Sequence, residues 1–241
     1  MAYVVTGGHS PIAIAISKSL SSKTTVFHVS SKIDLELQAT FAEHSEIVLE
    51  KWDLEQTTEC LEKFKQLLSH ENVEGVIFAH RYRSQMHDAI KQFVTEVETP
   101  HQLIKHYCEN YSGQFGSVIL FTSPAADSII PDQDFSYHAS KAALNQLVKF
   151  AAIKFSDRGV RTNGVCPGAF IEKERSRKFY SENPKRLEDI KEFIPLSRMG
   201  TLDEIADVVS YLCSPQSSYV NGVIINVDGG YSSMEPSFAL Y

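Results

Sequence analysis

Short runs of apolar and β-branched residues alternate along this chain with longer segments whose apolar positions recur at helical spacing. Stretches long enough for a crossover helix separate most of the short runs, which is typical of a parallel sheet covered on both faces. The sequence therefore predicts an α/β fold, a doubly wound parallel sheet of about seven strands with helices on both faces. The predicted strands are residues 3–6, 24–30, 47–52, 75–79, 118–122, 161–166 and 223–227.

Two of the intervening segments have well-marked helix ends. Thr201 and Glu204 have the spacing of a capping box, and apolar residues follow them at helical intervals. Residues 136–155 place apolar side chains on one face, and Gly159 after them suits the left-handed conformation that commonly follows a helix. No internal repeat, low-complexity tract or Gly/Ser linker interrupts the chain, so residues 1–241 are predicted to form a single domain.

The second of these helices carries a candidate pair of catalytic residues. Tyr137 and Lys141 are four residues apart, so on a helix they lie on the same face, one turn apart. A phenol loses its proton only near pH ~10 unless a neighbouring cation favours the phenolate. Such a spacing also occurs by chance on surface helices. What favours catalysis is Ser123, which follows the strand at 118–122, where its hydroxyl can hydrogen-bond a substrate oxygen that gains charge.

The turn after the first strand is a candidate phosphate-binding site. Residues 6–13 read TGGHSPIA and lead into a helix, whose N-terminal amides attract a dinucleotide pyrophosphate. Pro11 has no amide proton, but that amide is dispensable if Ser10 is the N-cap and Pro11 the first helical residue. The amides from Ile12 onward would then still point at the phosphate. The alternative is a strand-to-helix turn that binds no ligand.

With its motifs in this order, the chain resembles the short-chain dehydrogenase/reductase family. The resemblance centres on Ser123 and on the YxxxK spacing of Tyr137 and Lys141. It spans nearly the whole chain, because further matching sequences lie on both sides of these residues. They are TG at 6–7, RTNGVCPG at 161–168, RMG at 198–200, DEIA at 203–206, NG at 221–222 and VDGG at 227–230.

The resemblance implies a Rossmann-type NAD(P)-binding domain that transfers hydride between nicotinamide and a carbonyl or secondary alcohol. It implies that Tyr137 is the general acid/base, that Lys141 favours its phenolate and holds the nicotinamide ribose, and that Ser123 orients the carbonyl. Ser31 and Lys32 after the second strand suit the 2′-phosphate of NADP, so NADP is favoured over NAD. The expected cofactor-binding residues are Thr6, Gly7, Ser10, Ile12, Ser31, Lys32, Asp53, Leu54, Ala79, Tyr137, Lys141, Pro167, Gly168 and Phe170.

Two segments depart from the family pattern. Residues 80–83, His-Arg-Tyr-Arg, stand in the segment after the fourth strand where the family has an asparagine-containing sequence. The helix asparagine of the family's proton relay is absent, and Glu96 or a neighbour falls at its place. Arg81 and Arg83 either capture an anionic substrate or are solvated loop charges. The mixed charges of residues 172–178 favour an ordinary charged helix face.

Two other functions remain compatible with these residues. A 3-oxoacyl-thioester reductase would use the same catalytic residues, with the segment at 172–178 meeting a carrier or coenzyme A. A non-catalytic sensor or scaffold that binds a dinucleotide would account for the altered glycine turn and the missing asparagine. An enoyl reductase is disfavoured, because related double-bond reducers space their tyrosine and lysine more widely than YxxxK.

Composition narrows the partners and the compartment. The net charge of −7 disfavours nucleic acid and anionic membrane surfaces as partners, and no apolar stretch approaches the ~20 residues of a membrane span. The nine histidines lack metal-ligand spacing, so no metal is expected. The four cysteines are far apart and are expected to pack as small hydrophobic side chains in a reducing compartment, the cytoplasm. The resemblance implies a homodimer or homotetramer that acts on a small-molecule carbonyl or alcohol.

Overall fold

The computed structural model describes residues 1–84, 88–168 and 171–235, and these fold around one parallel sheet. Every pairing between neighbouring strands is parallel, and the strand order is β3-β2-β1-β4-β5-β6-β7. This is the predicted α/β architecture, so the fold-class prediction is confirmed. The strands are β1 (Ala2–Thr6), β2 (Thr25–Ser30), β3 (Ile47–Lys51), β4 (Val73–Phe78), β5 (Gly116–Phe121), β6 (Val160–Pro167) and β7 (Ile224–Val227).

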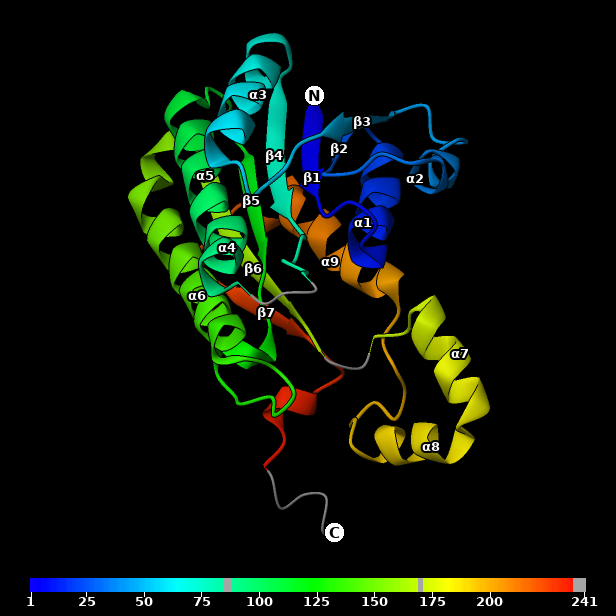
Figure 1. Cartoon of the computed structure of the whole chain (residues 1–241). Coiled ribbons are helices and arrows are strands. Elements are labelled where there is room, and N and C mark those ends of the chain that lie inside the picture. The colour runs from blue at the N-terminus through cyan, green and yellow to red at the C-terminus, as the bar shows by residue number, and fades with distance from the viewer. Residues whose placement is uncertain (85–87, 169–170, 236–241) are drawn as a thin grey trace.

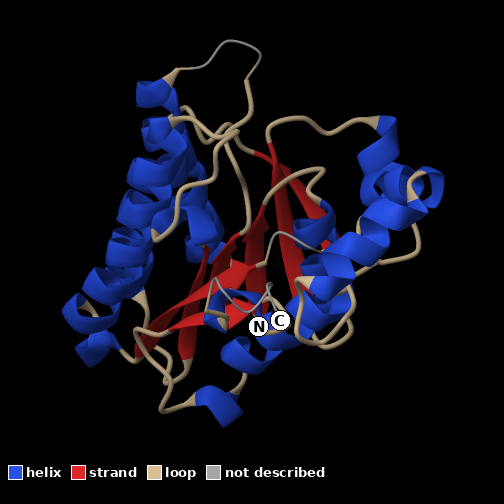
Figure 2. Cartoon of the chain, turned by 90° about the horizontal axis from the view of Figure 1, so that it is seen from below, coloured by secondary structure: helices blue, strands red, loops and turns tan. Residues whose placement is uncertain are grey.

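Helices cover both faces of the sheet, as the views in Figures 1 and 2 show. On one face lie α3 (Thr57–His70), α5 (Thr99–Asn110) and α6 (Phe135–Lys154). On the other lie α1 (Pro11–Ser21) and α9 (Leu202–Cys213), which pack against each other. The remaining helices are α2 (Leu35–Thr40), α4 (Ala89–Phe93), α7 (Glu174–Glu182) and α8 (Pro184–Glu192), with a π-helix, η1 (Val94–Glu98), between α4 and α5.

A separate apolar core fills each side of the sheet. Phe64, Tyr107 and Leu147 come from the three helices of one layer and pack under β1, β4 and β5. Ile16 and Ile205 belong to the opposite layer and pack on the other face of the same strands. Burying a side chain of this size contributes about 1.5–3 kcal/mol, so these contacts fix the helices that carry the polar site residues.

The strand order reverses direction at β1, which lies between β2 and β4. Open α/β sheets bind ligands in the crevice at the carboxyl ends of the strands at such a point. The turn after β1 and the loop after β4 meet there. In Figure 1, α7 and α8 lie beyond the same end of the sheet, outside the two helix layers.

All seven predicted strands are present, with ends that differ by one or two residues. Thr201 and Glu204 form the predicted capping box at the start of α9. Gly159 is left-handed with φ of 71°, but it follows a 3₁₀ turn, η3 (Ser156–Arg158), rather than α6 directly. The four cysteines are free and buried, in agreement with their expected packing as small hydrophobic groups. Among the helices of the described residues, none combines the length and apolarity needed to cross a membrane.

Candidate active site

Tyr137 and Ser123 meet at the carboxyl end of β5. Tyr137 lies in the first turn of α6, and Ser123 ends the extended segment after β5 and caps a short 3₁₀ turn, η2 (Pro124–Ala126). The tyrosine hydroxyl donates to the serine Oγ over 3.2 Å, and both side chains are buried. The serine Oγ also accepts from the amide of Ala125 over 3.2 Å, which fixes its position. The two hydroxyls can therefore hydrogen-bond one substrate oxygen between them.

Lys141 lies one turn further along α6, as its spacing predicts. Its Nζ is 5.6 Å from the centroid of the Tyr137 ring, and its side chain is 4% exposed. The structure thus brings together all three predicted catalytic residues, two from α6 and one from the end of β5. A buried ammonium acts strongly on neighbouring groups, because little water screens it.

The buried partner of Lys141 is Glu96. Its Oε2 lies 2.9 Å from the lysine Nζ, and the glutamate side chain is fully buried. The second oxygen, Oε1, accepts from the amide of Tyr82 over 2.9 Å. Glu96 belongs to η1, and π-helical turns of this kind often occur at functional sites, where the extra residue redirects a side chain. One carboxylate therefore joins α6 to the loop after β4.

His80 joins the same loop to the first strand. Its Nε2 lies 2.8 Å from the carbonyl oxygen of Thr95, and its Nδ1 lies 2.7 Å from Oγ1 of Thr6. A carbonyl only accepts, so Nε2 carries the proton and Nδ1 accepts from the threonine hydroxyl. Burial lowers the pKa of His80 to about 4, which keeps this ring neutral and both bonds in place at neutral pH. The sequence placed the remodelled segment here but did not predict this link.

The glycine turn after β1 is tightly packed. Gly7 has φ of +148°, and a Cβ on it would come within 2.4 Å of the Ala13 Cβ and 3.2 Å of the Ala79 carbonyl oxygen. The amides of Gly7 and Gly8 both donate to the carbonyl of Val29, at 3.2 and 3.0 Å. Only glycine fits where the turn, α1 and the end of β4 approach so closely. The same contact explains why a small residue, Ala13, stands on the helix side.

Helix α1 begins as predicted, with Ser10 as N-cap and Pro11 as the first residue. The Ser10 side chain makes no capping hydrogen bond. The amide of Ile14 donates to the Ser10 carbonyl, so the amides of Ile12 and Ala13 precede the first hydrogen bond within the helix. These are the amides that a helix N-terminus offers to an anion. The structure is thus compatible with the role predicted for Ile12.

His28 on β2 joins the glycine turn to α1. Its Nε2 lies 2.8 Å from the Gly8 carbonyl oxygen and its Nδ1 lies 2.8 Å from Oγ of Ser17 on α1. Burial lowers the pKa of His28 to about 4, so the ring is neutral and bridges the turn to the helix. A lone histidine within an apolar strand gave no signal of this role in the sequence.

A pocket lies between the glycine turn and the ends of β2, β3 and β4. Gly7, Ser31, Asp53 and Leu54, four of the predicted cofactor-binding residues, line it. Lys32 does not line it: its Nζ lies 2.8 Å from Asp34, whose other oxygen lies 2.9 Å from His9 Nε2. The cation predicted to meet a 2′-phosphate is therefore paired with a carboxylate of its own chain.

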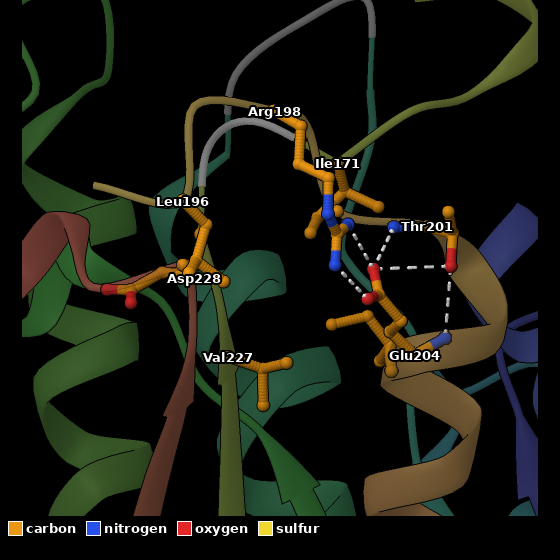
Figure 3. Close-up of a pocket in the computed structure, with 11 residues that line it drawn as sticks. Ile171, Leu196, Arg198, Thr201, Glu204, Val227 and Asp228 are labelled. Carbon is orange, nitrogen blue, oxygen red and sulfur yellow. Dashed lines mark hydrogen bonds and ion pairs between the residues drawn. The ribbon is translucent and has the colours of Figure 1, made fainter. Parts of the chain in front are cut away.

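The predicted cofactor-binding residues at the end of β6 do not line this pocket. Gly168 lines a second pocket, between the ends of β6 and β7 and the start of α9, while Pro167 ends β6. Figure 3 shows Arg198 and Glu204 facing each other there, with the guanidinium donating to both carboxylate oxygens at 2.5 and 3.0 Å. Neither Tyr137 nor Ser123 lines this pocket. Phe170, the last predicted cofactor residue, lies outside the described residues.

Comparison with known proteins agrees with this architecture. A family model described as "Enoyl-(Acyl carrier protein) reductase" matches residues 77–232, more than half of the chain. Glucose 1-dehydrogenase of Gluconobacter oxydans is 33% identical over 139 residues, which are 57% of this chain and 50% of that protein. Senescence-associated protein 13 of Arabidopsis thaliana is 28% identical over 245 residues, 95% of this chain and 89% of that protein.

Solved structures agree over a greater length. The structure of ElxO with NADP bound superposes with a TM-score of 0.83 at 20% sequence identity, covering 97% of this chain and 99% of that one. At this identity the likeness shows the fold. The matched segments span only about half the length of most of the first curated relatives. The family match and the order of the motifs agree, and this chain belongs to the short-chain dehydrogenase/reductase family, whose members are oxidoreductases.

Proposed function

We propose that this protein is an NAD(P)-dependent oxidoreductase that interconverts a carbonyl compound and a secondary alcohol, with Tyr137 as general acid/base. The observation that carries the proposal is the hydrogen bond between the Tyr137 hydroxyl and Ser123 Oγ, 3.2 Å long and buried. A tyrosine placed against a serine and a buried ammonium is a proton donor to a carbonyl oxygen.

Each residue has a separate task in this mechanism. Ser123 holds the substrate oxygen, and Tyr137 gives its proton to that oxygen during reduction or takes it back during oxidation. Lys141 stabilises the phenolate that remains, because its ammonium lies 5.6 Å from the ring centroid. Glu96 holds the lysine side chain in place through the 2.9 Å ion pair, which makes it a positioning residue.

The glycine turn fits a dinucleotide. The amides of Gly7 and Gly8 donate to the carbonyl of Val29, which holds the turn close to β2. The amides of Ile12 and Ala13 face the turn and have no hydrogen-bond partner within the helix. Ser31, Asp53 and Leu54 would hold the adenosine half, since they line the pocket beside the turn. Bound NAD(P)H would supply the hydride for carbonyl reduction, and bound NAD(P)⁺ would accept it in alcohol oxidation.

NADP is the preferred cofactor in this proposal. Ser31 and Lys32 follow β2, where Rossmann-type domains contact the 2′-hydroxyl or 2′-phosphate of the adenosine ribose. Asp34 competes for the lysine, but no acidic residue lies between β2 and Lys32 to select a free 2′-hydroxyl. The ElxO structure, which contains NADP, has the same fold, in line with this preference.

Carbonyl reduction suits the site better than reduction of a carbon–carbon double bond. The matched family model bears the description of an enoyl reductase. The four-residue spacing of Tyr137 and Lys141 favours carbonyl chemistry, because double-bond reducers of the resembling group space these residues more widely. Retention of Ser123 beside Tyr137 argues against a sensor without catalysis, since a scaffold needs neither hydroxyl.

We also propose a homodimer or homotetramer in the cytoplasm. Phe150 and Ile153 on the outer side of α6 are 47% and 79% exposed. Exposed apolar side chains on this helix agree with subunit contacts through the long helices, by which members of the family usually assemble. Light scattering coupled to gel filtration tests the assembly, and a Phe150→Glu/Ile153→Glu variant should be smaller than the parent.

The direct test of the function is a panel of carbonyl compounds with NADPH and NADH. Consumption of the reduced cofactor should fall by about 100-fold or more in Tyr137→Phe, which removes the acid/base and keeps the ring. Tyr219→Phe is the matched control, because that side chain is fully exposed and distant from the site. Equal consumption by the parent and Tyr137→Phe across the panel would show that the protein is not this enzyme.

A further inference from the structure

A guanidinium group lies on the ring of the catalytic tyrosine. The Arg81 Cζ is 4.2 Å from the centroid of the Tyr137 ring, at cation–π distance. Its Nη2 donates to Oε1 of Gln133 over 2.6 Å, which holds the guanidinium over the ring. Arg81, Arg83, Gln133 and Tyr137 line one pocket. A positive charge therefore faces the space next to the reacting hydroxyl.

A second guanidinium group, that of Arg83, lines the same pocket two residues further along the loop. Like charges gathered in this way repel one another, so an anion bound in the pocket lowers this repulsion.

The chain itself supplies little negative charge at this place. Arg83 forms no side-chain ion pair with any of the described residues. Asp134 lines the same pocket and offsets part of the charge. With Asp134 counted, the two guanidinium groups still leave an excess of positive charge.

Cofactor phosphates are the other anions that could neutralise this charge. Arg81 and Arg83 also line the pocket that contains Gly7 and Asp53, so the two pockets are neighbours. The Arg81 guanidinium is directed over Tyr137 and bonded to Gln133, which lines the tyrosine pocket and not the glycine-turn pocket. The charge is therefore centred on the substrate side.

We propose that Arg81 and Arg83 bind an anionic group of the substrate, a carboxylate or a phosphate, close to the carbonyl that Tyr137 protonates. The inference rests on the proposed function and names its substrate class: a short oxo acid or keto phosphate, or the corresponding hydroxy compound. Guanidinium groups match both anions, because their parallel N–H groups bind two oxygens at once. The contact of Arg81 with the tyrosine ring places the anion only a few bonds from the reacting carbon.

The test compares charged substrates with neutral partners of nearly equal shape. The pairs are benzoylformate and its methyl ester, acetoacetate and methyl acetoacetate, and dihydroxyacetone phosphate and dihydroxyacetone. With NADPH, kcat/KM for the preferred anion should exceed that of its neutral partner by about tenfold or more, as charge-assisted hydrogen bonds allow. The best pair shows whether the site takes carboxylate or phosphate. The ratio should decline as salt is added, because screening weakens the attraction.

Variants assign the preference to these residues. Arg81→Gln and Arg83→Gln should each lower the ratio of charged to neutral substrate several-fold, and the double variant should bring it close to one. Arg158→Gln is the matched control, an exposed arginine in η3 with only a 3.6 Å contact to Asp157, and it should keep the parent's ratio. Loss of NADPH affinity in Arg83→Gln as large as the loss of anion preference would overturn the proposal, because the arginine would then serve the cofactor.

Calorimetric binding of the same compounds to the NADP⁺ complex separates this inference from the proposed function. If the anions bind in an Arg83-dependent manner and nothing is turned over, the anion site stands and the oxidoreductase proposal fails. If neutral ketones are reduced in a Tyr137-dependent manner and the anions neither bind nor react better, the anion site fails and the enzyme stands. Anion binding that is equal in Arg83→Gln and the parent would also overturn the anion site.

Discussion

The ammonium nitrogen of Lys141 lies 2.9 Å from Oε2 of Glu96, and the two side chains are 4% and 0% exposed. A buried ion pair contributes little over an apolar pair, but removal of one partner leaves a charge without compensation. This pair also connects α6, which carries the proposed acid/base, to the loop that carries Arg81 and Arg83. The proposed proton transfer and the proposed anion binding therefore share one electrostatic link.

Glu96→Gln should destabilise the protein by about 3 kcal/mol or more, measured by urea denaturation at pH 7. The amide keeps an oxygen that can accept from the Tyr82 amide, so the variant isolates the loss of charge. Adding Lys141→Met should recover a large part of the loss, because the uncompensated ammonium is then gone. Strictly additive losses in the double variant would show that the two charges do not interact.

Cofactor preference should respond to Lys32 and Asp34 in opposite directions. The hydrogen bond from Lys32, followed by that from His9, holds the pKa of the Asp34 carboxyl well below its usual range, so Asp34 remains charged throughout the assay range. In fluorescence titrations NADPH should bind more tightly than NADH. Lys32→Ala should weaken NADPH about tenfold, and Asp34→Asn should strengthen it by freeing the lysine. Tighter binding of NADH to the parent protein contradicts the NADP preference.

Stability should fall as the pH drops from 6.5 to 4. His28 and His80 have pKa values of about 4 in the folded protein because burial disfavours the charged ring, against 6.5 for a free histidine. Below pH 6.5 the two histidines bind protons in the unfolded chain but stay neutral in the folded protein until the pH approaches 4. Each histidine therefore lowers the free energy of unfolding by up to about 3 kcal/mol at pH 4. Above pH 6.5 both states are neutral and this dependence vanishes.

Urea denaturation at pH 7, 6, 5 and 4.5 measures this loss. A His28→Gln/His80→Gln variant is expected to be less stable at pH 7, because the bonds to Gly8 and Thr95 change, but to depend less on pH. His70→Gln, at the exposed C-terminal end of α3, serves as the control and should keep the slope of the parent. The same slope in the double variant and the parent would assign the pH dependence to other groups.

The sheet and the placement of Tyr137 and Lys141 one turn apart on a helix could be predicted because local patterns determine them. Short runs of β-branched residues are typical of the strands of a parallel sheet. Residues four apart on a helix, such as Tyr137 and Lys141, lie on the same face. The capping box at Thr201 and Glu204 is equally local, and it is found where the sequence predicts it. These features need no knowledge of tertiary contacts.

The contacts around the site could not be predicted in this way. Glu96 was placed near the missing asparagine by spacing, but its ion pair depends on a π-helical turn that shifts side-chain directions. The position of Arg81 over Tyr137 depends on a loop conformation that no local pattern determines. The ion pair between Lys32 and Asp34 likewise depends on the conformation of the chain after β2 and could not be predicted from the sequence.

The most direct test of the central claim is transfer of label from the cofactor to the product. NADPH carrying deuterium at the transferable position of its nicotinamide ring is incubated with the best ketone of the panel, and the alcohol is analysed by mass spectrometry and NMR. The account predicts deuterium on the carbinol carbon, formed at least about 100-fold more slowly by Tyr137→Phe. Absence of label in the alcohol, or equal rates for the parent and Tyr137→Phe, would contradict it.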